Sequence, residues 1–302
     1  MGLGAPSGVR AASRADRPPV AAELTVEQAW FLGERLGAGA FPWALAITAP
    51  YQDERQRVRL GAQHAKDLAE VGVVGADGSV DPSVAGWIHT VCRPDRWLEL
   101  RYVVASPHAD GDPGSAHPKL LRGFVARTQS QTVVALRNAQ LVAFTAIEAD
   151  EPSALVPSVV AGLSQRAPAQ FPEFTLPAEA GAKADEKLRS GASLDDVVER
   201  LGIPPAARPV VQAALRGRRS YVEVVAGQRD GAAKRSTEVG VSVVDTGAGR
   251  VLVSPRRAAD GVWLSTFAPG TPFAIAVAVD QLTAELPEGR WFPNARLTKS
   301  FN

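Results

Sequence analysis

The chain of 302 residues is 45% hydrophobic, so it can bury a large core as one large domain or two smaller ones. Its formal net charge of +1 gives no global field that would favour nucleic acid or an anionic membrane surface. The single cysteine, Cys92, excludes internal disulfides and a zinc site built on cysteines, and the four histidines lack metal-site spacing.

The N-terminal stretch is small, basic and proline-containing, and it lacks the apolar segment of a signal peptide. We therefore predict a disordered tail over residues 1–22. No apolar run reaches the roughly 18 residues that a membrane span needs. These features predict a cytoplasmic protein without membrane insertion.

Helix signals come first in the ordered part of the chain. A capping box at Thr25–Gln28 predicts a helix that ends before Gly37. Apolar residues at four-residue spacing predict a second helix over 55–71, and a third follows Asp81 as its N-cap. Cys92 falls on this third helix among apolar neighbours, which predicts a buried structural thiol.

Strand signals follow, and one more helix closes the first half. β-branched and aromatic residues fill 96–104, 120–128, 132–138 and 140–147, with turn residues between them. The last two segments are close enough to form a hairpin. A helix is predicted over 152–163.

The same pattern recurs beyond a proline-rich connector at 164–176. The predicted elements of this second half are helices at about 178–190, 194–201 and 206–216, strands at 219–227, 237–245, 249–255 and 261–268, and a helix at 271–282. The offset between the halves is about 120 residues, far longer than a solenoid repeat.

This repetition predicts an α+β fold built from a pseudo-twofold duplicated unit. The halves, 23–163 and 177–302, are expected to form a single domain with one continuous antiparallel core, and helices are expected on one face. Two separate domains joined at the connector are the alternative.

Residues 245–248, Asp-Thr-Gly-Ala, match the tetrapeptide that presents the catalytic carboxylate of aspartic proteases. Such an enzyme needs two carboxylates that share one proton, and the corresponding first-half segment, 126–132, contains none. Valine-rich strand segments flank the motif. We therefore predict a hairpin turn in which Asp245 accepts backbone hydrogen bonds and Gly247 or Gly249 adopts positive φ. A hydrolase that uses Asp245 is the alternative.

The long polar segment 106–119 lies between two strands that otherwise favour a tight hairpin, and its counterpart at 227–236 is also extended and charged. Loops of this kind on a rigid sheet are common binding elements, and a tolerated insertion is the alternative. The acidic and histidine residues of 108–117 could suggest a metal loop, but the glutamate of an EF-hand is missing. No metal and no cofactor are predicted.

The helices over 178–216 offer more apolar side chains than one sheet face requires. They are Leu188, Leu194, Val197, Val198, Leu201, Val211 and Leu215. This surplus predicts either ordinary core packing or a groove for a partner's helix.

Several stretches, among them RWLELRYVV, TVVALRNAQLVAFTA, DGVWLSTFAPGT and WFPNARLTKSF, resemble the EspG family of cytosolic specificity chaperones in mycobacterial type VII (ESX) secretion. The resemblance runs from about Leu24 to Phe301 and is greatest to the paralogue of the third ESX system. It implies a non-enzymatic protein with an antiparallel sheet flanked by N-terminal and C-terminal helical bundles. It also implies binding of PE–PPE heterodimers at the apolar tip of the PPE helical bundle, which keeps the pair soluble for export. A structural subunit of a secretion complex is an alternative.

The resemblance also implies where the partner binds. In the family the contacts come from the loop between the second and third strands and from the C-terminal bundle, here 106–119 and roughly 178–216, and the exposed sheet face between them completes the site. The predicted partner-binding residues are Ser106, His108, Asp110, Asp112 and His117 in the loop, Leu194, Val197, Val198 and Leu201 on a groove rim, and the charged Arg208, Arg216, Arg218 and Glu223. We also allow for weak self-association.

Overall fold

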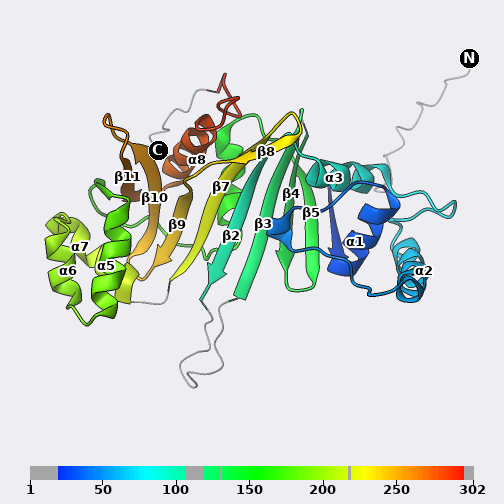
Figure 1. Cartoon of the computed structure of the whole chain (residues 1–302), viewed down its shortest axis with the longest axis horizontal. Coiled ribbons are helices and arrows are strands. Elements are labelled where there is room, and N and C mark those ends of the chain that lie inside the picture. The colour runs from blue at the N-terminus through cyan, green and yellow to red at the C-terminus, as the bar shows by residue number, and fades with distance from the viewer. Residues whose placement is uncertain (1–19, 106–118, 130, 217–218, 296–302) are drawn as a thin grey trace, which may run out of the picture.

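The computed structural model describes residues 20–105, 119–129, 131–216 and 219–295. Its centre is one antiparallel sheet with the strand order β1-β5-β4-β3-β2-β7-β9-β10-β11-β6, and β8 pairs with β7 outside this path (Figure 1). β2 and β7, which come from the two halves of the sequence, pair from Arg96↔Gln228 to Val103↔Tyr221. The halves therefore share one sheet.

The first-half strands agree closely with the sequence pattern. They are β1 (Ala21–Thr25), β2 (Arg96–Val104), β3 (Lys119–Thr128), β4 (Gln131–Asn138) and β5 (Leu141–Ile147). The predicted β4–β5 hairpin is confirmed, with Ala139 at a φ of 52° in its turn. The prediction of disorder through residue 22 is wrong, because Ala21 and Ala22 pair with β5.

The second-half strands depart from the sequence pattern in two places. They are β6 (Phe174–Pro177), β7 (Ser220–Asp230), β8 (Ala233–Ser236), β9 (Val241–Thr246), β10 (Gly249–Arg257) and β11 (Trp263–Pro269). β6 falls inside the predicted connector and pairs with β11 at the sheet edge. The segment 227–236, predicted as a loop, is the hairpin of β7 and β8.

The described helices form a group at each end of the sheet, and further helices lie along the middle of one face (Figure 1). At one end lie α1 (Val26–Arg35), α2 (Glu54–Glu70) and α3 (Pro82–Cys92), and the 3₁₀ turn η2 (Trp43–Leu45) between α1 and α2 lies over β3. At the other end lie α5 (Glu179–Arg189), α6 (Leu194–Arg200), the 3₁₀ turn η4 (Pro205–Ala207) and α7 (Arg208–Arg216). The 3₁₀ turn η3 (Pro152–Leu155), α4 (Val156–Val160) and α8 (Pro272–Ala284) complete the described helices.

Helix boundaries follow the capping residues. Thr25 and Gln28 form the predicted capping box, with Oγ1 of Thr25 accepting from the Gln28 amide at 3.1 Å. The Asp81 carboxylate accepts from two backbone amides at the start of α3, and Ser193 caps α6. The predicted helix over 152–163 is shorter than expected, because a 3₁₀ turn forms first and α4 ends at Val160.

Helices cover both faces of the sheet, so the prediction that they cover one face is wrong. α8 packs with η3 on the face that carries Val222, Val224 and Val243, and these residues share one apolar core. On the other face α1 and α3 pack against the first-half strands, and α7 packs against β9. The middle of this second face, over β2 and β7, is left uncovered by the described helices (Figure 1).

Two close contacts fix β2 against its neighbours. A Cβ atom on Gly227 would lie 2.2 Å from the indole of Trp97, so only glycine lets β7 approach β2 here. The Tyr102 hydroxyl donates to the carbonyl of Ser158 at 2.5 Å, which fixes α4 against β2.

Cys92 is buried, as predicted, and burial raises the pKa of its thiol to about 12. The thiol is therefore protonated and unreactive at neutral pH. No helix in the described part of the chain is long and apolar enough to cross a membrane.

Candidate functional site

The candidate site begins with the uncovered sheet surface, which we call the open face and define by Glu99, Arg101, Val103, Tyr221, Glu223 and Val225. These side chains alternate with buried core residues along β2 and β7, and all six are at least partly exposed. Strand alternation therefore separates a packed face from a solvent-facing one.

An ion pair crosses the centre of the open face. Nη1 of Arg101 lies 3.6 Å from Oε2 of Glu223, and the side chains are 68% and 45% exposed. An exposed pair of this kind contributes little to stability, so a partner's charged groups can replace either side of it at small cost. Glu223 thus lies where the sequence predicts a selecting charge, and Arg101 lies beside it.

The C-terminal helices form an apolar pocket of about 240 Å³ next to this face. It is lined mainly by aromatic and aliphatic side chains, including Phe171, Phe174, Leu201, Val211, Leu215, Val244 and Phe267. The rings of Phe174 and Phe267 stack with centroids 4.9 Å apart. Val244 of the pocket pairs in register with Tyr221 of the open face, so the two surfaces are continuous.

The start of segment 106–119 and the exit of the C-terminal helices also meet. The backbone N–H of Ala105 donates to Oγ of Ser220 at 3.0 Å. Ala105 directly precedes the predicted loop, and Ser220 begins β7 just after α7. The fold thus brings the described flanks of both predicted binding segments to the same end of the sheet.

Two of the four residues predicted on the groove rim are buried instead. Val197 and Val198 are only 2% and 1% exposed, so the expectation that they lie partly at the surface is wrong. α6 packs against both α5 and α7, and Val198 belongs to the small core of these helices with Ile203. A short helix between two others must bury this side to be stable.

The other two apolar rim residues are half-buried. Leu201 lines the pocket, and Leu194 packs against the same small core. Among the predicted charges, Arg208 is half-buried and its Nε donates to the carbonyl of Ile203 at 3.2 Å, so it fixes a turn.

The remaining predicted site residues cannot be placed. Ser106, His108, Asp110, Asp112, His117 and Arg218 lie outside the described residues, as does the side chain of Arg216. Of the described residues, no group of three His, Cys, Asp or Glu side chains could hold a metal ion.

Sequence reasoning missed Arg101 and the aromatic floor of the pocket. In RWLELRYVV, the polar residues Glu99 and Arg101 alternate with apolar residues in the middle of the strand. This alternation predicts that Arg101 faces solvent. Phe171 and Phe174 lie in the proline-rich connector, whose composition conceals a strand.

The segment 245–248 forms the predicted hairpin turn between β9 and β10, and Gly249 has a φ of 114°. Among the described residues, no backbone N–H donates to the Asp245 carboxylate, so that part of the prediction is wrong. The carboxylate pairs with the guanidinium of Arg250, with Nε to Oδ1 at 2.7 Å and Nη2 to Oδ2 at 3.1 Å. Oγ1 of Thr246 stabilises the turn instead, accepting from the amide of Ala248.

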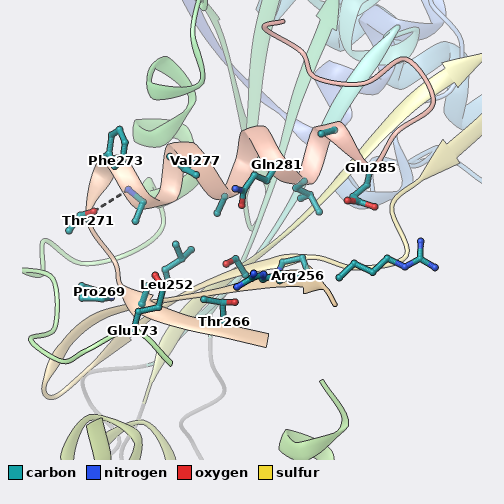
Figure 2. A pocket seen from close by; sticks show the side chains of 18 of the residues that line it. Glu173, Leu252, Arg256, Thr266, Pro269, Thr271, Phe273, Val277, Gln281 and Glu285 are labelled. Atoms are coloured by element: carbon teal, nitrogen blue, oxygen red, sulfur yellow. Dashed lines mark hydrogen bonds between the residues drawn. The ribbon is translucent and has the colours of Figure 1, made fainter. Parts of the chain in front are cut away.

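A second hollow lies on the opposite face, between α8 and the outer strands β10 and β11 (Figure 2). Its volume is about 920 Å³. Phe273, Val277 and Gln281 line it from α8, and Leu252 and Thr266 line it from the strands (Figure 2). None of the predicted partner-binding residues that the structure describes lines this groove.

Comparison with known proteins decides the family. The model of the EspG family matches residues 25–281. The chain belongs to the EspG family. It is 55% identical to the ESX-3 secretion-associated protein EspG3 of Mycobacterium tuberculosis (strain CDC 1551 / Oshkosh), over 95% of this chain and 98% of that protein.

More distant relatives fit the same assignment. Identity to the ESX-1 secretion-associated protein EspG1 of M. tuberculosis (strain H37Rv) is 29%, over 95% of this chain and 94% of that protein. The predicted family, with greater similarity to the third ESX system, is therefore confirmed.

The fold is also found in a solved structure, that of the M. tuberculosis type VII secretion system chaperone EspG5 in complex with a PE25–PPE41 dimer. The TM-score is 0.72 at 22% sequence identity, and the alignment covers 90% of this chain and 99% of EspG5.

Burial of Val198 predicts that Val198→Asp unfolds the C-terminal helices. An unpaired carboxylate in a core of this kind costs about 3 kcal/mol or more of unfolding free energy. Val58→Asp on α2 is the control, because Val58 is 64% exposed. Thermal unfolding followed by circular dichroism should show a lower melting temperature and weaker helical signal for Val198→Asp alone. Equal melting of the two variants would contradict the assigned core.

The buried ion pair predicts a structural role for Asp245. Asp245→Asn leaves Arg250, whose side chain is 11% exposed, without its charge partner. We expect the free energy of unfolding to fall by about 3 kcal/mol. The matched control is Asp230→Asn, which breaks an exposed pair with Arg235 at the same spacing and should cost under about 1 kcal/mol. Urea unfolding measures both. Similar losses in the two variants would refute the structural assignment.

Proposed function

We propose that this chain is a cytosolic, secretion-specific chaperone that binds cognate PE–PPE heterodimers at the PPE helical tip and keeps them soluble for ESX export. The observation that carries the proposal is the fold shared with EspG5 along 90% of the chain, since EspG5 was solved as a chaperone bound to a PE–PPE dimer. The high identity to an ESX-3 secretion-associated protein supports the third ESX system as the source of the partners.

The surface chemistry supports the same partner. The pocket beside Phe174 and Leu201 offers apolar walls to side chains exposed at a helical tip, and covering such side chains would keep the partner soluble. The open face adds charged and polar groups around it, which is the anatomy of a specific interface. We expect a total buried area of the order of 1,500–2,500 Å².

We also propose that the two halves are copies of one unit related by a pseudo-twofold axis between β2 and β7. The strand order supports this, because β3, β4, β5 and β1 follow outward from β2 as β9, β10, β11 and β6 follow outward from β7. Under this relation α1–α3 and α5–α7 are the N-terminal and C-terminal bundles of the family. They then bound the open face from its two sides.

Co-expression with one PE–PPE pair from each ESX system tests the function. Size-exclusion chromatography with light scattering should show a stoichiometric soluble complex with pairs of the third system and none with the others. Failure to bind any pair would overturn the proposed function. Binding to pairs of every system would overturn its specificity.

The pocket can be tested by Leu215→Ser. Leu215 lines the pocket and is half-buried, so the change should remove an apolar contact with the partner at little cost in folding. We expect affinity for the cognate pair to fall at least about tenfold, as at an interface hot spot. Leu141→Ser is the control, because Leu141 is 44% exposed at the start of β5, away from the pocket. If calorimetry gave the same affinity for Leu215→Ser and the wild-type chain, the pocket would not be part of the partner's binding site.

A further inference from the structure

Trp43 stands out as the tryptophan that is most exposed to solvent. It is 87% exposed, whereas Trp87, Trp97 and Trp291 are between 2% and 4% exposed and the remaining two are half-buried. An indole is among the largest apolar groups that a protein can bury. Packing within the described part of the chain does not explain why an indole stands at this exposed position.

The segment that carries Trp43 is firmly held. Its neighbours Phe41, Leu45 and Ile47 are 7%, 0% and 4% exposed, so the chain on either side of the indole is buried in the N-terminal core. Ala46, three residues after Trp43, has a φ of 48°, a left-handed conformation that is unfavourable for a non-glycine residue. Such a conformation persists only where its surroundings hold it, and it is often found at binding sites.

Two arginines from the sheet hold this turn. Nη1 of Arg137 donates to the carbonyl of Leu45 at 2.9 Å and also to that of Ala46, and Nη1 of Arg122 donates to that of Ala44 at 3.4 Å. The turn η2 is therefore fixed at successive carbonyls, while the side chain of its first residue points into solvent.

The same arginines show which surface Trp43 borders. Arg122 pairs in register with Arg101 on β2 and with Arg137 on β4, so the three side chains lie on the same side of the sheet as the open face. η2, the small blue turn in front of β3 in Figure 1, also contacts β2 and β4. Trp43 thus belongs to the edge of the open face that lies opposite α7.

The open face is bordered by elements of both halves. η2 lies on β3 and α7 lies on β9, and three strand spacings, or about 14 Å, separate the axes of these two strands. Packed helices have their axes about 8–10 Å apart. A partner's helical tip above β2 and β7, further from the sheet than η2 and α7, is therefore within packing distance of both.

We propose that Trp43 is an anchor residue for the partner, packing its indole against an apolar flank of the PPE helical tip as that tip lies across Arg101 and Glu223. This inference rests on the proposed function. It adds a contact from the N-terminal half to the pocket of the C-terminal half. Because the turn is already ordered, burying the indole costs little conformational entropy on binding.

The first test is the affinity of Trp43→Ala for the cognate PE–PPE pair, measured by calorimetry with the full chain. We expect at least about a tenfold weaker Kd and an unchanged melting temperature, because the side chain is exposed. Val58→Ala on α2 is the control for loss of an exposed apolar side chain and should bind like the wild type.

The second test reports the indole directly. The chain alone is labelled with 5-fluorotryptophan, and the ¹⁹F signal of Trp43 is assigned by its absence in Trp43→Ala. On adding the unlabelled pair, this signal should shift and lose its sensitivity to the H₂O–D₂O exchange of the solvent.

The outcomes separate the two proposals. Wild-type affinity in Trp43→Ala, with a solvent-exposed fluorine signal in the complex, would overturn the anchor and leave the chaperone function standing. No complex between the wild-type chain and any PE–PPE pair would overturn both.

Discussion

The pairing of β2 with β7 is the constraint on which the rest of the structure depends. It joins strands more than a hundred residues apart, and it is close enough that Trp97 lies directly over Gly227. Once these strands pair, alternation turns one set of side chains into the common core with α8 and the other set outward. The open face is thus the necessary reverse side of the central core.

What happens on this reverse side depends on where the helices lie. Each group of helices packs on the outer strands of its own half, where the outward side chains are apolar, as with Phe124 in one half and Phe267 in the other. In the middle, Glu99, Arg101 and Glu223 also face outward, and a helix of the same chain packed there would have to cover these charged groups. A charged strip bordered by apolar groups is suited to a partner that binds reversibly, since its ion pair is exposed and weak.

Much of this could be predicted from the sequence where local patterns decide the structure. Strand β2 and the caps at Thr25, Asp81 and Ser193 follow from alternation and from side-chain hydrogen bonding. The surface position of Val198 was predicted wrongly because a seven-residue helix has too few turns to show which side its neighbours cover. β6 was missed because its pairing with β11 is a long-range contact within a proline-rich segment. The turn that presents Trp43 is held by hydrogen bonds from Arg122 and Arg137, which reach carbonyls 78 and 92 residues away in the sequence.

In two ion pairs of this structure, an arginine lies five residues after its aspartate in the sequence. Comparing them shows that this spacing alone does not determine whether the pair is buried. Asp230–Arg235 and Asp245–Arg250 have the same spacing and both span a hairpin, yet one is exposed and the other almost fully buried. The difference comes from a tertiary contact. The guanidinium of Arg250 also donates to the carbonyl of Ser164, and this bond holds the start of the connector over the turn. The same logic applies to Arg122 and Arg137, whose bonds to carbonyls turn surface charges into fixed supports. In this fold arginine side chains fix irregular backbone next to the sheet, and the turn that presents Trp43 is one such segment.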